Sequence, residues 1–134
     1  MVRAVLLDFD GTLVDTMGEY ADAVANIVAP VVGRREEEVR RLYLSYSGLP
    51  FDRQLSKMYP DLDPGVREGI ISLFRERKVE ILRGKTVGEG ARRAISTLRG
   101  AGLAVFISSN LEQDILDWFV EKEGLPVDLS LIHI

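Results

Sequence analysis

The sequence has no cysteine, one histidine, one tryptophan and five prolines among its 134 residues. Because cysteine is missing, disulfides, thiolate catalysis and cysteine-ligated metal sites are excluded. The single histidine, His133, lies in an apolar run at the end of the chain, and we assign it no role. Chemistry in this protein must therefore rest on oxygen and on lysine or arginine nitrogen.

The sequence also has no long run of one charge. Its 17 basic and 21 acidic residues are interleaved and give a net charge of −4. No basic stripe predicts a nucleic-acid partner, and no Lys/Arg cluster predicts a membrane surface. The N-terminal apolar run is too short for a signal peptide or a membrane span, and Asp8 and Asp10 interrupt it. We expect a cytoplasmic protein; the oligomeric state is left open.

Strand and helix patterns alternate along the chain. Residues 2–8 (VRAVLLD) form a nearly continuous apolar run, which predicts a strand buried on both faces of a parallel sheet. Residues 103–107 (LAVFI) and 127–134 (VDLSLIHI) predict two more strands. The block over 16–84 is helical throughout, and one helix lies on either side of 103–107. This order predicts an α/β fold, a parallel sheet with a helical insertion after its first strand.

Single residues predict where the helices begin and end. Asp15 or Thr16 caps the first helix, which Pro30 helps to end. Asn110 caps the helix after 103–107, and Gln113 three residues later completes a capping box.

Residues 8–12 (DFDGT) combine two carboxylates with a glycine. Asp8 and Asp10 are two positions apart, so an extended chain points them to one side, just past the carboxyl end of the first strand. Gly11 permits a tight turn and a close approach of backbone N–H groups to an anion. Adjacent carboxylates repel each other, and Mg²⁺ suits such an all-oxygen site. A simple Asp-x-Asp-Gly turn is the alternative.

Three other motifs fail on single positions. A calcium-binding EF-hand loop that starts at Asp8 would need glycine where Leu13 stands. A phosphate-binding Walker A motif that ends in residues 84–86 (GKT) would need glycine where Val79 stands. The dinucleotide motif GxGxxG fails because Arg93 takes the place of its last glycine.

Residues 8–16 (DFDGTLVDT) resemble the first motif of the haloacid dehalogenase superfamily, a buried strand followed by DxDGTLxDS/T. Residues 90–110 (GARRAISTLRGAGLAVFISSN) resemble the stretch through its second motif. The resemblance implies a Rossmann-like core over 1–15 and 85–134, in which the C-terminal strands are missing. It also implies an inserted, all-helical C1 cap over 16–84.

The resemblance also implies roles for the first motif. Asp8 would be the nucleophile that attacks phosphorus, and Asp10 would be the general acid and then the base. Mg²⁺ would be held by the Asp8 carboxylate and the Asp10 backbone carbonyl. Backbone amides near Phe9 and Gly11 would face the phosphate. Because the dehalogenases generally lack the second aspartate, Asp10 favours phosphoryl transfer.

The second motif of the family is a serine or threonine that hydrogen-bonds the phosphoryl group. It usually stands seven residues after the glycine before the strand; counted from Gly102, this selects Ser109 rather than Ser108, with Asn110 in the following position. Helix capping is the alternative role for either serine. We favour phosphate binding for Ser109, because Asn110 is expected to cap the helix.

The segment 47–54 (SGLPFDRQ) resembles the substrate-specificity loop of the C1 cap, which closes over the active site. Arg53 is its candidate contact to an anionic substrate. An ordinary solvated arginine is the alternative.

Two parts of the family pattern have no counterpart here. The family has a lysine past its third strand and an acidic pair after a fourth, whereas Lys122 lies in the helix before the third strand. Without a fourth strand, the strand over 2–8 becomes an open edge, which predicts poor solubility or pairing with another chain. The final residues LSLIHI equal the translation of CTG-TCT-CTT-ATA-CAC-ATC, a sequencing adapter. We therefore hypothesise that 129–134 are adapter-derived; a genuine third strand is the alternative.

Together these residues predict a Mg²⁺-dependent phosphomonoester hydrolase that acts on a small phosphorylated metabolite through an aspartyl-phosphate. A sugar-phosphate phosphomutase of the same family is one alternative. A catalytically inactive fragment or binding module is the other, because the lysine and acidic motifs are absent. Loss of a cation and a metal ligand typically costs several kcal/mol of transition-state stabilisation, so we expect little activity from the 134-residue chain itself.

Overall fold

The computed structural model describes residues 1–131 and divides the chain into two compact units. One unit comprises Met1–Asp15 and Gly84–Ile134, and is called the α/β unit here. The other comprises Thr16–Arg83 and is called the helical unit. No helix within residues 1–131 is both long and apolar enough to cross a membrane.

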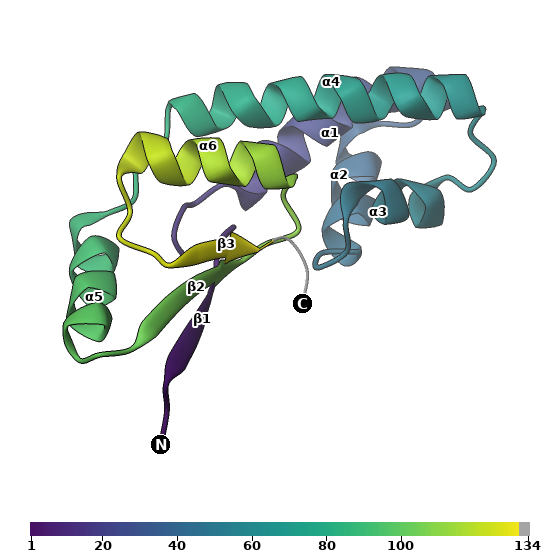
Figure 1. Ribbon diagram of the computed structural model, residues 1–134. Helices are drawn as coiled ribbons and strands as arrows, with labels where there is room; N and C mark the ends of the chain where they lie inside the picture. Colours follow the sequence, from purple (N-terminus) through teal and green to yellow (C-terminus); the bar gives the residue numbers. More distant parts are fainter. Residues whose placement is uncertain (132–134) are drawn as a thin grey trace. The chain divides into compact units, whose positions relative to one another are not determined.

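The α/β unit contains a three-stranded parallel sheet in the order β1-β2-β3 (Figure 1). Its strands are β1 (Ala4–Asp8), β2 (Ala104–Ser108) and β3 (Leu129–Leu131). Its helices are α5 (Glu89–Gly100), which packs against β2, and α6 (Gln113–Glu123), which packs against β3. The predicted parallel α/β fold with a helical insertion is confirmed.

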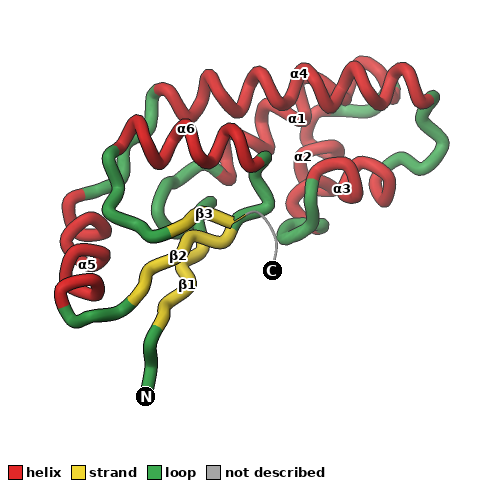
Figure 2. Tube along the Cα trace, viewed as in Figure 1, coloured by secondary structure: helices red, strands yellow, loops and turns green. Residues whose placement is uncertain are grey.

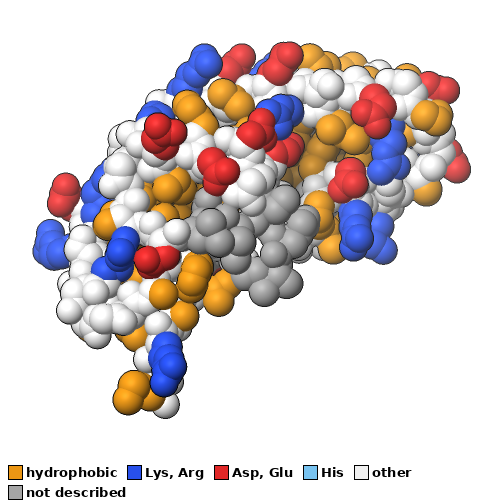
Figure 3. All heavy atoms as spheres, viewed as in Figure 1, with side chains coloured by type: hydrophobic (Ala, Val, Ile, Leu, Met, Phe, Trp, Pro, Cys, Tyr) orange, Lys and Arg blue, Asp and Glu red, His pale blue; other side chains and the backbone are white. Residues whose placement is uncertain are grey.

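Strand β1 is less buried than its sequence predicts. Ala4, Leu6 and Asp8 are exposed and Val5 and Leu7 are only half-buried, so the prediction of a strand buried on both faces is wrong. The reason is that β1 pairs with β2 alone among residues 1–131, as predicted for an open edge. Hydrophobic side chains consequently reach the surface near the N-terminal end of the chain (Figure 3).

A largely buried carboxylate joins the two ends of the segment from Val87 to Glu123. The Glu123 side chain is only 6% exposed. Its Oε1 accepts hydrogen bonds from Arg92 Nη2 at 2.8 Å and from the Val87 N–H at 2.7 Å, and its Oε2 accepts one from Lys122 Nζ at 2.9 Å. Burial alone would raise the pKa of Glu123, but these hydrogen bonds and the charges of Lys122 and Arg92 lower it below its usual value.

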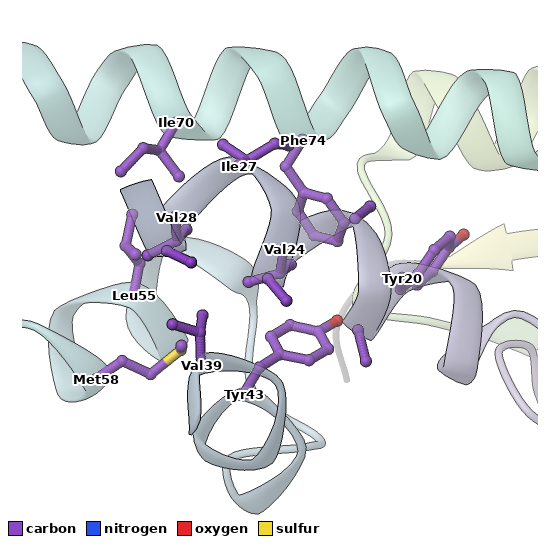
Figure 4. Packing of buried hydrophobic residues seen from close by; sticks show 14 residues of the cluster. Tyr20, Val24, Ile27, Val28, Val39, Tyr43, Leu55, Met58, Ile70 and Phe74 are labelled. Atoms are coloured by element: carbon purple, nitrogen blue, oxygen red, sulfur yellow. The ribbon is translucent and has the colours of Figure 1, made fainter. Parts of the chain in front are cut away.

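The helical unit contains α1 (Met17–Val32), α2 (Glu36–Ser45), α3 (Phe51–Met58) and α4 (Pro64–Arg83). They enclose one cluster of buried side chains, to which Val24 and Val28 of α1 contribute from the middle (Figure 4). Phe74 of α4 points into this cluster, where its ring lies 4.4 Å from that of Phe51 and 6.1 Å from that of Tyr43, centroid to centroid. The predicted helical block is thus confirmed.

Pro30 does not end the first helix. It lies inside the last turn of α1, which continues to Val32. A proline this close to the end removes only one backbone hydrogen bond. Gly33 ends the helix instead, because it adopts a left-handed conformation with φ 67° and its N–H bonds the Ala29 carbonyl.

Strand β3 begins next to a side-chain anchor. The Asp128 N–H donates to the Val105 carbonyl at 2.8 Å, and its Oδ2 accepts from the Val105 N–H at 2.6 Å. The backbone of Leu129–Leu131 then pairs with β2. The adapter hypothesis for residues 129–134 falls partly outside the described residues and stays a prediction, and His133 also lies outside them.

Candidate active site

Strands β1 and β2 end at the same level of the sheet. Asp8 closes β1 and pairs in register with Ser108, which closes β2. Since the strands are parallel, the segments that follow them leave from one edge, where open α/β sheets bind ligands. Figure 2 shows the loops that follow the yellow strands at this edge. The sheet therefore brings the DFDGT segment and the Ser108–Asn110 segment together.

The segment after β1 folds into a tight loop around one carbonyl group. The Phe9 carbonyl accepts hydrogen bonds from three backbone N–H groups, those of Thr12 at 3.1 Å, Leu13 at 2.9 Å and Val14 at 3.4 Å. Gly11 has φ 79°, a conformation that side-chain-bearing residues rarely adopt, and its N–H donates to the Val14 carbonyl at 2.7 Å. The backbone of the loop thus stabilises its own conformation.

The two carboxylates of this loop flank a buried ring. Phe9 is fully buried and meets Phe119 edge to face, with centroids 5.3 Å apart. Asp8 is exposed and Asp10 half-buried, as expected if both point away from the core on the same side. The Thr12 hydroxyl lies 3.4 Å from Asp8 Oδ2, to which it donates. Thr12 was not singled out from the sequence, although its hydroxyl four residues after Asp8 is part of the motif.

The oxygen donors of this loop suit Mg²⁺ but do not by themselves enclose it. Carboxylate and carbonyl oxygens are the ligands that Mg²⁺ prefers, and the ion commonly keeps several waters. Asp8 and Asp10 supply two carboxylates. Within residues 1–131, no group of three or more His, Cys, Asp or Glu side chains could hold a metal ion. The residues fit an ion held by few protein ligands and by water or substrate oxygens.

Ser109 is 6% exposed and its Oγ accepts the Leu111 N–H at 3.0 Å. This bond uses a lone pair of Oγ and leaves the hydroxyl hydrogen to donate. The predicted cap by Asn110 and its capping box with Gln113 are wrong, because α6 begins at Gln113 with Glu112 as its N-cap residue. The hydroxyl of Ser109 instead stabilises the turn before the helix, and Gln113 Nε2 donates to Asp117 Oδ1 at 2.8 Å.

Two cationic residues named from the sequence, Arg53 and Lys122, make contacts within their own units. Arg53 is exposed in the first turn of α3 in the helical unit, where its own N–H bonds Asp52 Oδ1 at 2.8 Å. Lys122 Nζ lies near the end of α6, bonds the Lys85 carbonyl at 3.0 Å and is 4.9 Å from the centroid of the Phe119 ring. Lys122 is therefore engaged in structural contacts.

Known proteins match nearly the whole length of the chain. The family model described as haloacid dehalogenase-like hydrolase matches residues 2–129. No curated protein matches the chain. A predicted phosphatase from Clostridium acetobutylicum is a structural match, with a TM-score of 0.77 and 19% identity over 99% of this chain and 62% of that one.

Two further solved structures have the same fold. CbbY from Rhodobacter sphaeroides, in complex with xylulose-(1,5)bisphosphate, has a TM-score of 0.71 and 18% identity over 97% of this chain and 63% of its own. A predicted phosphoglycolate phosphatase from Haemophilus somnus has a TM-score of 0.74 and 13% identity over 97% of this chain and 62% of its own. The chain thus spans less than two thirds of the length of these structures.

Proposed function

The chain belongs to the haloacid dehalogenase-like hydrolase family, and on that premise we propose that the protein hydrolyses a small phosphorylated metabolite through an aspartyl-phosphate. The observation that carries the proposal is the end of β1. There Asp8 and Asp10 flank the buried Phe9. Asp8 pairs in register with Ser108, the last residue of β2, and Ser109 is the next residue of that segment. Two carboxylates beside a hydroxyl donor supply a nucleophile, an acid and a phosphate contact.

In the first step, an Asp8 carboxylate oxygen attacks the phosphorus of the substrate. The bond from phosphorus to the leaving oxygen breaks as the new bond from Asp8 forms, and the Asp10 carboxyl donates its proton to the leaving oxygen. In the second step, Asp10 takes a proton from water, and that water attacks phosphorus. Phosphate then leaves and the Asp8 carboxylate is regenerated.

The backbone and Ser109 would bind the phosphoryl oxygens. The buried hydroxyl of Ser109 has a hydrogen left to donate once Leu111 has used its lone pair. Backbone amides at Phe9 and Asn110 border the same edge. The Gly11 N–H already donates to Val14, so we assign Gly11 to shaping the loop rather than to a phosphate contact through that N–H.

The Asp8 carboxylate and the Asp10 backbone carbonyl would hold Mg²⁺, with water in the other positions. When bound, the ion supplies positive charge that neutralises the transferring phosphoryl group. Thr12 would keep one Asp8 oxygen oriented through the hydrogen bond that its hydroxyl donates. Thr12 is thus a positioning residue for the nucleophile.

A phosphorylated sugar is the substrate class that the relatives favour, because CbbY binds xylulose-(1,5)bisphosphate. Arg53 would contact an anionic group of that substrate. The same residues could serve a sugar-phosphate phosphomutase, in which the aspartyl-phosphate passes to a sugar hydroxyl instead of to water. A sugar monophosphate in the assay distinguishes the two, since a mutase converts it to the isomeric monophosphate without net release of phosphate, whereas a phosphatase releases the phosphate.

Phosphate release with Mg²⁺ tests the proposal, and Asp8→Asn is the matched control because it removes the nucleophile with little change in shape. We expect release by the parent, slow as it is predicted to be, and a loss of at least about 10³-fold in Asp8→Asn. Equal rates in parent and control would overturn the aspartyl-phosphate mechanism. Absence of release from both would favour the inactive fragment or binding module.

A further inference from the structure

A concave surface lies on the helical unit. It is open to solvent, has a volume of about 500 Å³ and is called the α2 groove here. It is lined by Arg34, Glu38, Arg41, Leu42, Ser45 and Tyr59. These residues come from α2, from the turn before it and from the residue after α3, and they include none of the segment 47–54. The volume falls in the range of small-molecule sites, about 300–1,000 Å³.

Two guanidinium groups of the α2 groove have no carboxylate partner in the described part of the chain. Among residues 1–131, neither Arg34 nor Arg41 forms an ion pair, whereas Glu38 is paired with Arg35 at 3.3 Å outside the groove lining. Another arginine of α2 is engaged differently, since Arg40 bonds Asp22 at 2.8 Å. The groove therefore has an excess of positive charge, which favours an anionic ligand.

The rest of the groove lining is apolar or neutral. Leu42 and Tyr59 are half-buried and supply apolar surface. Burial raises the pKa of the Tyr59 phenol, and the nearby charge of Glu38 raises it further. The charge of Arg34 acts in the opposite direction but does not cancel these effects, so the phenol keeps its proton at neutral pH. Ser45 donates to the Leu42 carbonyl at 2.6 Å, and its lone pairs remain as acceptors.

We propose that the α2 groove binds a small amphiphilic anion, a flat apolar body that carries one carboxylate or comparable anionic group. The anionic group pairs with Arg34 and Arg41, and the apolar body covers Leu42 and the Tyr59 ring. The groove lining includes none of the proposed catalytic residues, and the proposal does not depend on the proposed hydrolase activity.

Titration of the ¹⁵N-labelled protein with 2-naphthoate, followed by NMR, tests the site. We expect saturable shifts confined to α2, the turn at Arg34 and Tyr59, and about tenfold weaker binding in each of Arg34→Gln and Arg41→Gln, the effect of one charge-assisted hydrogen bond. Arg83→Gln is the matched control, because Arg83 is an exposed arginine of the same unit outside the groove. It should bind as the parent does.

The neutral analogue 2-naphthalenemethanol separates charge recognition from apolar contact. We expect it to bind at least tenfold more weakly than 2-naphthoate. Equal binding of both compounds, shifts centred away from α2, or unchanged affinity in both groove variants would each overturn the proposal. The spectra of the free variants, compared with that of the parent, establish that each variant is folded, and Asp8→Asn should leave the titration unchanged.

Discussion

The two units of this protein differ in how completely they cover their apolar side chains. The helical unit encloses a cluster of 14 buried residues between its helices. In the α/β unit, Val105 and Ile107 of β2 are fully buried, but Leu6 of the neighbouring β1 is 53% exposed. An apolar sequence is thus buried only where other elements cover it. The candidate catalytic carboxylates lie at the end of this strand, Asp8 as its last residue and Asp10 two positions later.

The largest effects on the free energy of unfolding should come from removing a buried aromatic ring from the core of either unit. Phe74→Ala in the helical unit and Phe119→Ala in the α/β unit each remove a buried ring, and each should lower the free energy of unfolding of its own unit by about 3–5 kcal/mol. Trp118, the only tryptophan, reports on the α/β unit by fluorescence, while far-UV circular dichroism reports mostly on the helices. In urea, Phe74→Ala should shift the circular dichroism transition more than that of Trp118, and Phe119→Ala the reverse. Equal shifts of both signals in both variants would mean that the units unfold as one.

A smaller effect is expected at the carboxylate that holds α5 and α6 together. Glu123→Gln should lower the free energy of unfolding of the α/β unit by about 2 kcal/mol at pH 7, because it removes charge-assisted hydrogen bonds from Arg92 and Lys122. Since the pKa of Glu123 in the folded protein is lower than in the unfolded chain, this stability is present at neutral pH and is lost as the pH falls below about 4.5.

Urea titrations of parent and Glu123→Gln at a series of pH values measure this difference. The two proteins should converge in stability as the pH falls below 4.5 and through the lower pKa of Glu123 in the folded protein. Glu121→Gln, at an exposed position of the same helix, is the control and should change little. A cost of Glu123→Gln that grows toward acid pH would contradict the stated direction of the pKa shift.

The smallest effect on stability, within about 0.5 kcal/mol, is expected for Leu6→Lys on exposed β1. Its effect on association should be larger, because a charge next to an open strand edge opposes pairing with another chain. Light scattering across a concentration series should show less self-association than in the parent. Unchanged association would mean that the surface around Leu6 takes no part in it.

The order of elements could be predicted from the sequence because each depends on local patterns. Helical periodicity and short β-branched runs indicated the strands and the helices between them. Burial of β1 could not be predicted, because it depends on which elements lie beside the strand rather than on its own residues.

Within the candidate site, too, the features set by local sequence could be predicted, whereas those set by the path of the chain could not. The convergence of Asp8 with the end of β2 follows from parallel register and was foreseeable from the motif. That Ser109 rather than Asn110 accepts a backbone N–H in the turn before α6 was not foreseeable, because several polar residues there could each cap a helix and the backbone path decides between them. The contact of Glu123 with Arg92 joins residues far apart in sequence, and no local pattern indicates it.

The claim that Asp8 carries the phosphoryl group is tested most directly by isolating the labelled protein. The parent and Asp8→Asn are incubated with Mg²⁺ and ³²P-labelled acetyl phosphate, quenched in acid and digested, and the label is located by peptide mapping. A single turnover suffices, so a slow enzyme still gives a signal. We predict a hydroxylamine-labile label on the peptide that contains Asp8, absent from Asp8→Asn. Label on another residue, or none in the parent, would contradict the assignment of Asp8 as the nucleophile of this chain.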